Sequence, residues 1–303
     1  MKISIIGCGR VGTTTAYAMM LKGLAREIVL VDVNTDRSKG EQLDLLHGTA
    51  ELANVDVIWG DYSRISGSDI VVITAGIPRK PGESRLDLAA KNINVIRDIG
   101  ERVLANAPDA LVLMVSNPVD VMTHLVQKVF GERKNQVFGL GNVLDLLRFR
   151  SLVGKELGVH PQKVNAMVIG EHGDSMVVLE DDITVSGLPL RHYGAITEDR
   201  MKDIIHDTKY GGAKVIALKG GTYYSVGIAI CQVIEAIVYD TKEVLPVCYM
   251  QKYNGRDITY SYPAIIGKKG IMGTLDIKLS NDKASLFEDS VNVIAGMIEQ
   301  LGI

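Results

Sequence analysis

The sequence predicts an α/β protein that begins with a doubly wound parallel sheet, and three observations support this fold class. Short apolar runs such as Ile70–Ile73 are typical of strands buried on both faces. Segments with helical spacing alternate with these runs through the first half of the chain, which is the pattern of right-handed βαβ units. Glycine, proline or small polar residues follow several of the runs, at the sheet edge where such folds bind ligands.

Composition places the chain among soluble globular proteins with a large core. It has 303 residues, of which 47% are hydrophobic and 23% charged, and a net charge of −3 without a long run of one sign. This balance argues against nucleic acid as a partner. No segment has the length of a membrane span or the pattern of a signal peptide, so no membrane association is expected. Cys8, Cys231 and Cys248 lie far apart, which favours a reducing cytoplasm and no metal site.

The expected elements of the first half follow from apolar runs and their boundaries. A helix ends near Gly23, and the longest one is stopped by Pro108. Strands are expected at Lys2–Ile6, Glu27–Val31, Val55–Trp59, Asp69–Thr74, Leu111–Val115 and Val137–Phe138, and helices at Thr13–Leu24, Asp36–Ala50, Ser84–Ala107 and Val119–Phe130.

The first strand leads directly into a G-x-G-x-x-G motif. Gly7 permits a tight turn, Gly9 lets a pyrophosphate approach the backbone, and Gly12 lets the helix pack closely on the strand. Asp32 ends the next strand, twenty residues after Gly12, where a carboxylate binds ribose hydroxyls and repels a 2′-phosphate. The motif indicates a Rossmann domain that binds NAD rather than NADP. The alternative is a glycine turn with a surface aspartate.

Two further strand ends carry candidate ligand groups. The strand Asp69–Thr74 runs into a cationic loop, 74–88, whose prolines and Gly82 suit a lid that moves as a unit. A solvated basic loop is the other interpretation. Asn117 follows the fifth strand and could bind both cofactor and substrate through its amide, or cap the helix after Pro118.

In the second half, a helix at Asn142–Leu157 places Asp145 and Arg148 on one face. The strand Lys163–Ile169 leads into GEHGDS, in which His172 is flanked by glycines. A neutral imidazole there can accept a hydroxyl proton if a carboxylate holds its other nitrogen. Asp145 and Asp174 are both candidates for that carboxylate, and a purely structural histidine is the alternative.

The remaining pattern predicts a second, α+β domain. We expect residues 1–141 to form the dinucleotide-binding domain and residues 142–303 the substrate domain, without a linker between them. The expected elements are two helices in Thr197–Tyr239, a strand at Val244–Tyr249, antiparallel strands in Ile265–Lys278, and a final helix at Asn281–Leu301.

Four motifs resemble the lactate/malate dehydrogenase family over essentially the whole chain. They are GEHGDS (170–175), SNP (116–118), LDLLRFR (144–150) and PRKPGESRLDL (78–88). The resemblance implies an NAD-dependent oxidoreductase of 2-hydroxy acids, assembled as a homotetramer or a homodimer. It makes His172 the proton acceptor and Asp145 its partner, and gives the substrate C1 carboxylate to Arg148 and the C2 oxygen to Arg85.

The resemblance extends to the substrate and cofactor contacts. Asn117 and Thr222 match positions beside the substrate, and Arg79 matches the position that selects it, with glutamine for pyruvate and arginine for oxaloacetate. A buried second carboxylate needs a cation, so we expect a malate dehydrogenase of the tricarboxylic acid cycle, acting on malate and oxaloacetate. The residues expected to contact NAD are Gly7, Gly9, Arg10, Val11, Gly12, Asp32, Thr74, Gly76, Asn92, Val115 and Asn117.

Several alternatives stay open. An L-lactate dehydrogenase has the same fold and chemistry, and Arg79 is the residue that argues against it. A non-catalytic NAD-binding sensor would not need the histidine, aspartate and two arginines together. A metal-requiring NAD-dependent glycosidase would need a cysteine at a strand end where none is found.

Some bacterial lactate dehydrogenases of the family bind fructose 1,6-bisphosphate through an arginine and a histidine. Arg150 matches the arginine, but Asn165 stands at the position of the histidine, so we expect no activation by this ligand.

Overall fold

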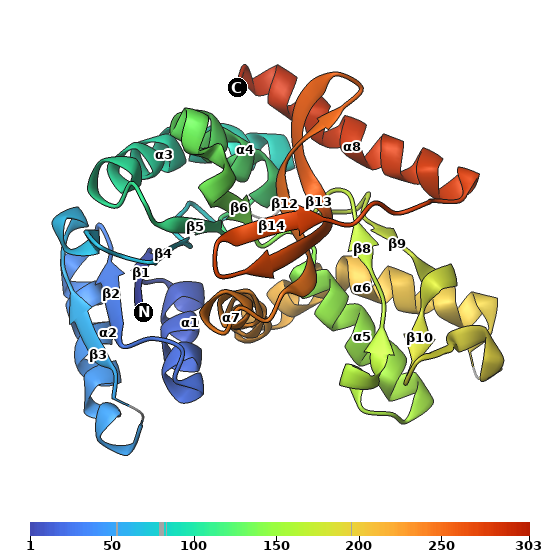
Figure 1. Ribbon diagram of the computed structural model, residues 1–303, viewed down its shortest axis with the longest axis horizontal. Coiled ribbons are helices and arrows are strands. Elements are labelled where there is room, and N and C mark those ends of the chain that lie inside the picture. The colour runs from blue at the N-terminus through green and yellow to red at the C-terminus, as the bar shows by residue number, and fades with distance from the viewer. Residues whose placement is uncertain (53, 79–81, 83, 195) are drawn as a thin grey trace.

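The computed structural model describes residues 1–52, 54–78, 82, 84–194 and 196–303 (Figure 1). The strands are β1 (Lys2–Ile6), β2 (Glu27–Val31), β3 (Asp56–Trp59), β4 (Ile70–Ile73), β5 (Leu111–Met114), β6 (Val137–Gly139), β7 (Val164–Asn165), β8 (Val168–Ile169), β9 (Val177–Val178), β10 (Thr184–Val185), β11 (Leu188–Pro189), β12 (Glu243–Tyr253), β13 (Arg256–Gly267) and β14 (Gly270–Thr274).

The α-helices are α1 (Arg10–Lys22), α2 (Thr35–His47), α3 (Arg85–Asn106), α4 (Val119–Phe130), α5 (Val143–Leu157), α6 (Glu198–Lys219), α7 (Tyr224–Val238) and α8 (Asn281–Leu301). Short 3₁₀ turns lie at Thr49–Glu51, Tyr62–Ile65, Gly131–Gln136, Pro161–Lys163, Glu180–Asp182 and Leu190–His192. Within the described part of the chain, no helix combines the length and apolar character needed to cross a bilayer.

The main sheet has nine strands in the order β14-β13-β12-β6-β5-β4-β1-β2-β3. The strands β1 to β6 are parallel, and β1 pairs with both β2 and β4. The chain therefore reverses its direction of winding between β1 and β4, and the crevice at such a switch point is the usual ligand site. This half confirms the predicted doubly wound sheet.

Helices cover both faces of the sheet (Figure 1). Alternate residues of each strand point to opposite faces, so Ile3 and Ile5 of β1 pack with α1 and α7, whereas Ile6 packs with α3 and α4. Gly227 of α7 allows the close approach to α1, because a Cβ there would lie 3.1 Å from the Thr14 side chain. A helix from the second half of the sequence thus completes the core of the N-terminal sheet.

The C-terminal strands differ most from the prediction. They extend the first sheet, because β12 pairs with β6 through Cys248 and Gly139. β12 and β13 form one long hairpin that turns at Asn254 and Gly255, both with positive φ. The sequence pattern predicted only part of it, because polar residues such as Lys252 interrupt the apolar run.

The predicted strand Lys163–Ile169 is also divided. β7 pairs with β10 in a three-stranded sheet, whereas β8 pairs with β9 in a separate two-stranded sheet. The separate pairing directs the chain after β8 toward β13, where Gly170 bridges to Ser261. The loop that carries His172 therefore begins from a fixed point on the main sheet.

Candidate active site

The turn between β1 and α1 forms a close-packed backbone cradle. Gly7 has φ +104°, and a Cβ there would lie 2.5 Å from the Ala75 nitrogen. A Cβ on Gly12 would lie 2.0 Å from the Gly7 oxygen. Both glycines are therefore required by the backbone itself, as the fingerprint predicts.

The helix that follows offers free N–H groups at its N-terminus. Gly9 is the N-cap of α1 and has no side chain to satisfy them, so they can bind an anion. Arg10, the first residue of the helix, is exposed and adds a positive charge. This arrangement fits the pyrophosphate of a dinucleotide.

Asp32 lies beside this cradle at the end of β2. Its Oδ2 accepts from the Cys8 backbone N–H at 2.6 Å, and its Oδ1 accepts from the Asn34 N–H at 2.9 Å. Each carboxylate oxygen has a second lone pair, so ribose hydroxyls can still bind. The carboxylate is thus held in a fixed position, and its expected contact with an NAD ribose stays a prediction.

The loops after β4 and β5 are tied to the same cradle. The Thr74 hydroxyl donates to the Gly7 oxygen at 2.8 Å, and the Ser116 hydroxyl donates to the Ala75 oxygen. Val115 precedes Ser116, and both Gly76 and Asn117 are exposed beside them. The expected cofactor residues therefore come together along one edge of the sheet, from four neighbouring strands.

Asn92 has a role that the sequence did not indicate. It is 1% exposed, and its amide accepts from the Ile77 N–H at 2.8 Å and donates to the oxygens of Ile77 and Asn117, at 3.2 and 3.1 Å. It joins the loops after β4 and β5 from α3. Its expected contact with the cofactor stays a prediction.

Two of the expected substrate residues, Arg79 and Thr222, need separate mention. Arg79 is outside the described residues. Thr222 lies between α6 and α7, where its hydroxyl is 3.4 Å from that of Ser225. The neighbouring Gly220 lies close to Arg10, since a Cβ on it would be 3.7 Å from that guanidinium. The Thr222 segment therefore adjoins the phosphate end of the crevice.

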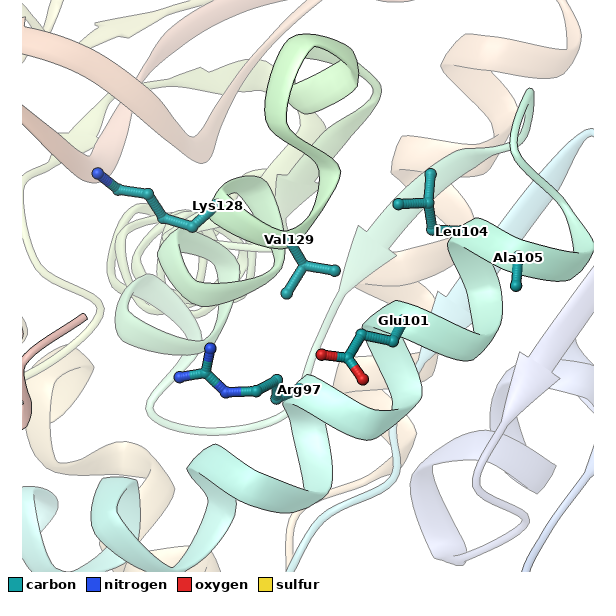
Figure 2. Close-up of a pocket in the computed structure, with 6 residues that line it drawn as sticks. All are labelled: Arg97, Glu101, Leu104, Ala105, Lys128 and Val129. Carbon is teal, nitrogen blue, oxygen red and sulfur yellow. The ribbon is translucent and has the colours of Figure 1, made fainter.

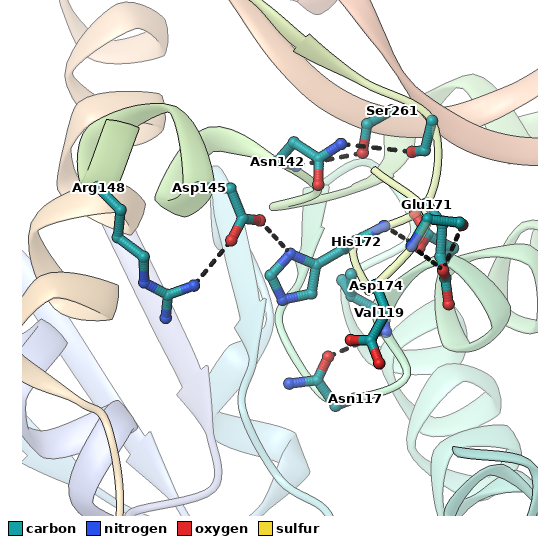
Figure 3. Close-up of polar contacts among 12 residues, drawn as sticks. Asn117, Val119, Asn142, Asp145, Arg148, Glu171, His172, Asp174 and Ser261 are labelled. Atoms are coloured by element: carbon teal, nitrogen blue, oxygen red, sulfur yellow. Dashed lines mark hydrogen bonds and ion pairs between the residues drawn. The ribbon is translucent and has the colours of Figure 1, made fainter. Parts of the chain in front are cut away.

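His172 is held by a carboxylate, and the structure selects which one. Its Nδ1 lies 2.6 Å from Asp145 Oδ2 (Figure 3). Asp174 contacts Arg85 instead, at 3.2 Å. Among the described residues, no hydrogen bond involves the other ring nitrogen, Nε2. A carboxylate on Nδ1 fixes the tautomer that leaves Nε2 free to accept a proton.

Charge coupling shifts both pKa values in the direction that favours the ion pair. Burial alone would lower the pKa of His172, but the charge and hydrogen bond of Asp145 raise it above its usual value. Burial would raise the pKa of Asp145, but His172 and Arg148 hold it below its usual value. A proton taken up by His172 is therefore stabilised by a carboxylate that remains ionised.

The two arginines contact different members of this pair. Arg148 donates to Asp145 Oδ1 at 2.7 Å, so Asp145 lies between Arg148 and His172 (Figure 3). Arg85, the first residue of α3, donates to the His172 carbonyl oxygen at 3.1 Å. Its side chain is 30% exposed and can reach a ligand. Four of the residues singled out from the sequence thus form one cluster.

Sequence patterns did not indicate three polar residues that support the cluster. Asp120 accepts from the His172 backbone N–H at 2.8 Å. Glu171 is 3% exposed and holds the Ser175 hydroxyl at 2.6 Å. The Asn142 amide is satisfied when its nitrogen faces Asp145 Oδ2, at 3.2 Å. An acidic residue within the apolar run of α4 was the available signal for Asp120.

Hollows elsewhere on the molecule do not include this cluster. One of about 470 Å³ lies between α3 and α4 and is lined by Arg97, Glu101, Leu104, Ala105, Lys128 and Val129 (Figure 2). Its charged side chains are exposed, so we assign it no function.

Comparison with known proteins gives a consistent family. The model of the lactate/malate dehydrogenase NAD-binding domain matches residues 1–139, and that of the family's α/β C-terminal domain matches residues 142–301. The chain is 38% identical to an L-lactate dehydrogenase of Thermoanaerobacter sp. (strain X514), covering 100% of this chain and 99% of the relative.

Solved structures are similar to this fold throughout. A minor L-lactate dehydrogenase from Enterococcus mundtii has a TM-score of 0.94 at 34% identity, covering 99% of this chain and 98% of that one. The malate dehydrogenase of Cryptosporidium parvum has a TM-score of 0.95 at 34% identity, with the same coverage. The fold therefore does not separate the two substrates.

The expectation that malate is the substrate is wrong on these comparisons. Curated relatives at 36–40% identity, covering 97–100% of this chain, are named L-lactate dehydrogenase. The expectation depended on a single side chain, Arg79, which lies outside the described residues. The assignment to the tricarboxylic acid cycle depended on malate and has no separate support.

Proposed function

The chain belongs to the lactate/malate dehydrogenase family and is an NAD-dependent 2-hydroxy acid dehydrogenase; from this premise we propose that its substrate pair is L-lactate and pyruvate. The names of the full-length relatives support this substrate. The observation that carries the chemistry is the 2.6 Å contact between His172 Nδ1 and Asp145, because it prepares Nε2 for proton transfer.

NAD, when bound, accepts the hydride from the substrate carbon. The protein moves the matching proton: His172 Nε2 takes it from the substrate hydroxyl, and Asp145 stabilises the resulting imidazolium. In the reverse direction the protonated ring returns it to the keto oxygen.

The two arginines supply the positive charge that an anionic substrate needs in a buried site. We assign the substrate carboxylate to Arg148, whose planar guanidinium can bind two oxygens, and the C2 oxygen to Arg85. Arg148 now donates to Asp145 through one nitrogen, which leaves other N–H groups for the substrate. Asn117 and Thr222 are the proposed neutral contacts on either side.

Excluding water from this site strengthens each of these charged contacts. We assign residues 1–141 to NAD binding and 142–303 to the substrate side. A homotetramer or a homodimer, located in the cytoplasm, is part of the same proposal.

A steady-state comparison of pyruvate and oxaloacetate, each with NADH, tests the substrate. We expect pyruvate to give the higher kcat/KM. A kcat/KM for oxaloacetate that exceeds the pyruvate value would refute L-lactate as the substrate.

His172→Asn tests the chemistry separately. Asparagine cannot accept a proton at neutral pH, so turnover with either keto acid should fall by ~10²–10⁴ while NADH binding is retained. A variant that keeps most of its turnover would make His172 structural.

A further inference from the structure

Asp120 is an acidic residue in an unusual place. It lies in the first turn of α4, whose other residues in that turn are apolar, and it is 3% exposed. Carboxylates near a helix N-terminus are stabilised by the helix dipole, but full burial of a charge costs much more than this gain. A buried carboxylate at this position therefore needs a partner that its charge or its hydrogen bonds stabilise.

The partner is the loop of His172. Asp120 Oδ2 accepts from the His172 backbone N–H at 2.8 Å, across 52 positions of sequence. Oδ1 is buried and has no hydrogen-bond partner of normal geometry among the described residues. The Cys248 thiol faces the carboxyl, and the Thr123 hydroxyl lies 3.5 Å from the Cys248 sulfur.

The charges around the ring show why a second carboxylate matters. Asp145 is shared between His172 and Arg148, so part of its charge is already neutralised. The charged groups that act on Asp120 are His172 and, with the opposite effect on its pKa, Glu171. On His172, Asp120 acts together with Asp145, and Arg85 opposes both.

We propose that Asp120 is a positioning residue of the acid–base step, which anchors the His172 main chain to α4 and serves as the second counter-charge of the protonated ring. This inference rests on the proposed function, in which His172 carries the proton. Burial raises the pKa of Asp120 to about 7, and the His172 charge acts to lower it, so the two groups titrate together.

The test is the titration of His172 itself. Asp120→Asn keeps an oxygen that can accept from the His172 N–H but removes the charge. NMR of ring-labelled histidine follows the titration without catalysis, and the chain has six histidines, so His172 is identified by the signal lost in His172→Asn. We expect the pKa of His172 to fall by about 1 unit in Asp120→Asn, as the loss of a nearby opposite charge predicts.

A matched control removes a carboxylate near another buried histidine. Asp257 acts on His124, so Asp257→Asn should leave the His172 titration unchanged. If Asp120→Asn does not fold, Asp120→Ser retains a hydroxyl acceptor in a smaller side chain and should give the same shift.

Kinetics provide a second measurement. In Asp120→Asn, the pH at which kcat/KM for pyruvate declines should move down with the His172 pKa, while the KM for NADH stays unchanged. A folded variant with an unaltered His172 pKa and pH profile would overturn the proposal and leave Asp120 with a structural role only. Because the titration does not require turnover, this result is distinct from a failure of the proposed function.

Discussion

Replacing Asp145 with asparagine tests the central pair of the site. The Asp145 side chain is buried, and its carboxylate accepts from His172 Nδ1 at 2.6 Å and from Arg148 at 2.7 Å, its two shortest contacts. Asparagine has a single acceptor oxygen, so it can serve one of these donors while its NH₂ group faces the other. The variant therefore loses a charge-assisted hydrogen bond and the counter-charge of the imidazolium.

The size of the effect follows from this geometry. A charge-assisted hydrogen bond contributes about 1.5–3 kcal/mol, and leaving a buried charge without its partner costs about 3–5 kcal/mol in total. At about 1.4 kcal/mol per factor of ten, turnover should fall by ~10²–10⁴. Because the carboxylate raises the pKa of His172, the variant should also move the pH dependence of pyruvate reduction to lower pH.

The assay is the decrease of NADH absorbance with pyruvate, measured as kcat and kcat/KM across pH. Asp174→Asn is the control, because this other carboxylate has a 66% exposed side chain and contacts only Arg85 among the described ion pairs. Exposed pairs contribute about 0–1 kcal/mol, so the control should lose less than ~5-fold. Equal losses in the two variants, or an unshifted pH profile in Asp145→Asn, would refute the assignment of Asp145 as the partner of His172.

Three further predictions concern the cofactor, regulation and stability. NADH should be preferred over NADPH because Asp32 repels a 2′-phosphate, and equal kcat/KM values with both would contradict this. Fructose 1,6-bisphosphate should not shift the pyruvate saturation curve, because Asn165 lines the hollow near Arg150 where a second cation would be needed, and a shift would count against the inference. Burial lowers the pKa of His124 from 6.5 to about 4, so as the pH falls the unfolded chain binds this proton before the folded chain does. The free energy of unfolding should therefore decrease by up to about 3 kcal/mol between pH 6.5 and pH 4. Urea unfolding of His124→Asn should lack this part of the decrease.

The sequence predicted the parallel half of the fold because its signals are local. Each strand of β1 to β6 is a short apolar run, and each is followed by its own turn residues. The fingerprint at Gly7 and Gly12 depends on contacts within a few residues and the adjacent loop, so its geometry follows the motif closely. The strands β12 and β13 were predicted only in part, because polar residues interrupt their apolar pattern. Pairing with distant strands stabilises them, and a local pattern does not report this pairing.

The substrate expected from one motif residue was wrong, and the comparison with known proteins gave the correction. Arg79 indicated a second carboxylate on chemical grounds, yet substrate choice depends on every group that faces the substrate in the closed site. Because residues from both halves of the chain form the site, one loop position does not suffice to predict the substrate.

The sequence by itself determined the sheet, the NAD cradle and the presence of His172 on a glycine-flanked strand end. Residue spacing left Asp145 and Asp174 open as partners of His172, the family resemblance indicated Asp145, and the tertiary structure places Asp145, 27 positions away, on the ring. Only the tertiary structure shows that Asp120, 52 positions away, holds the His172 main chain. It also decided that β12 to β14 join the first sheet. Periodicity and turn chemistry act over a few residues, whereas these contacts depend on how α4, α5 and β8 pack together, and that packing is set by the whole core.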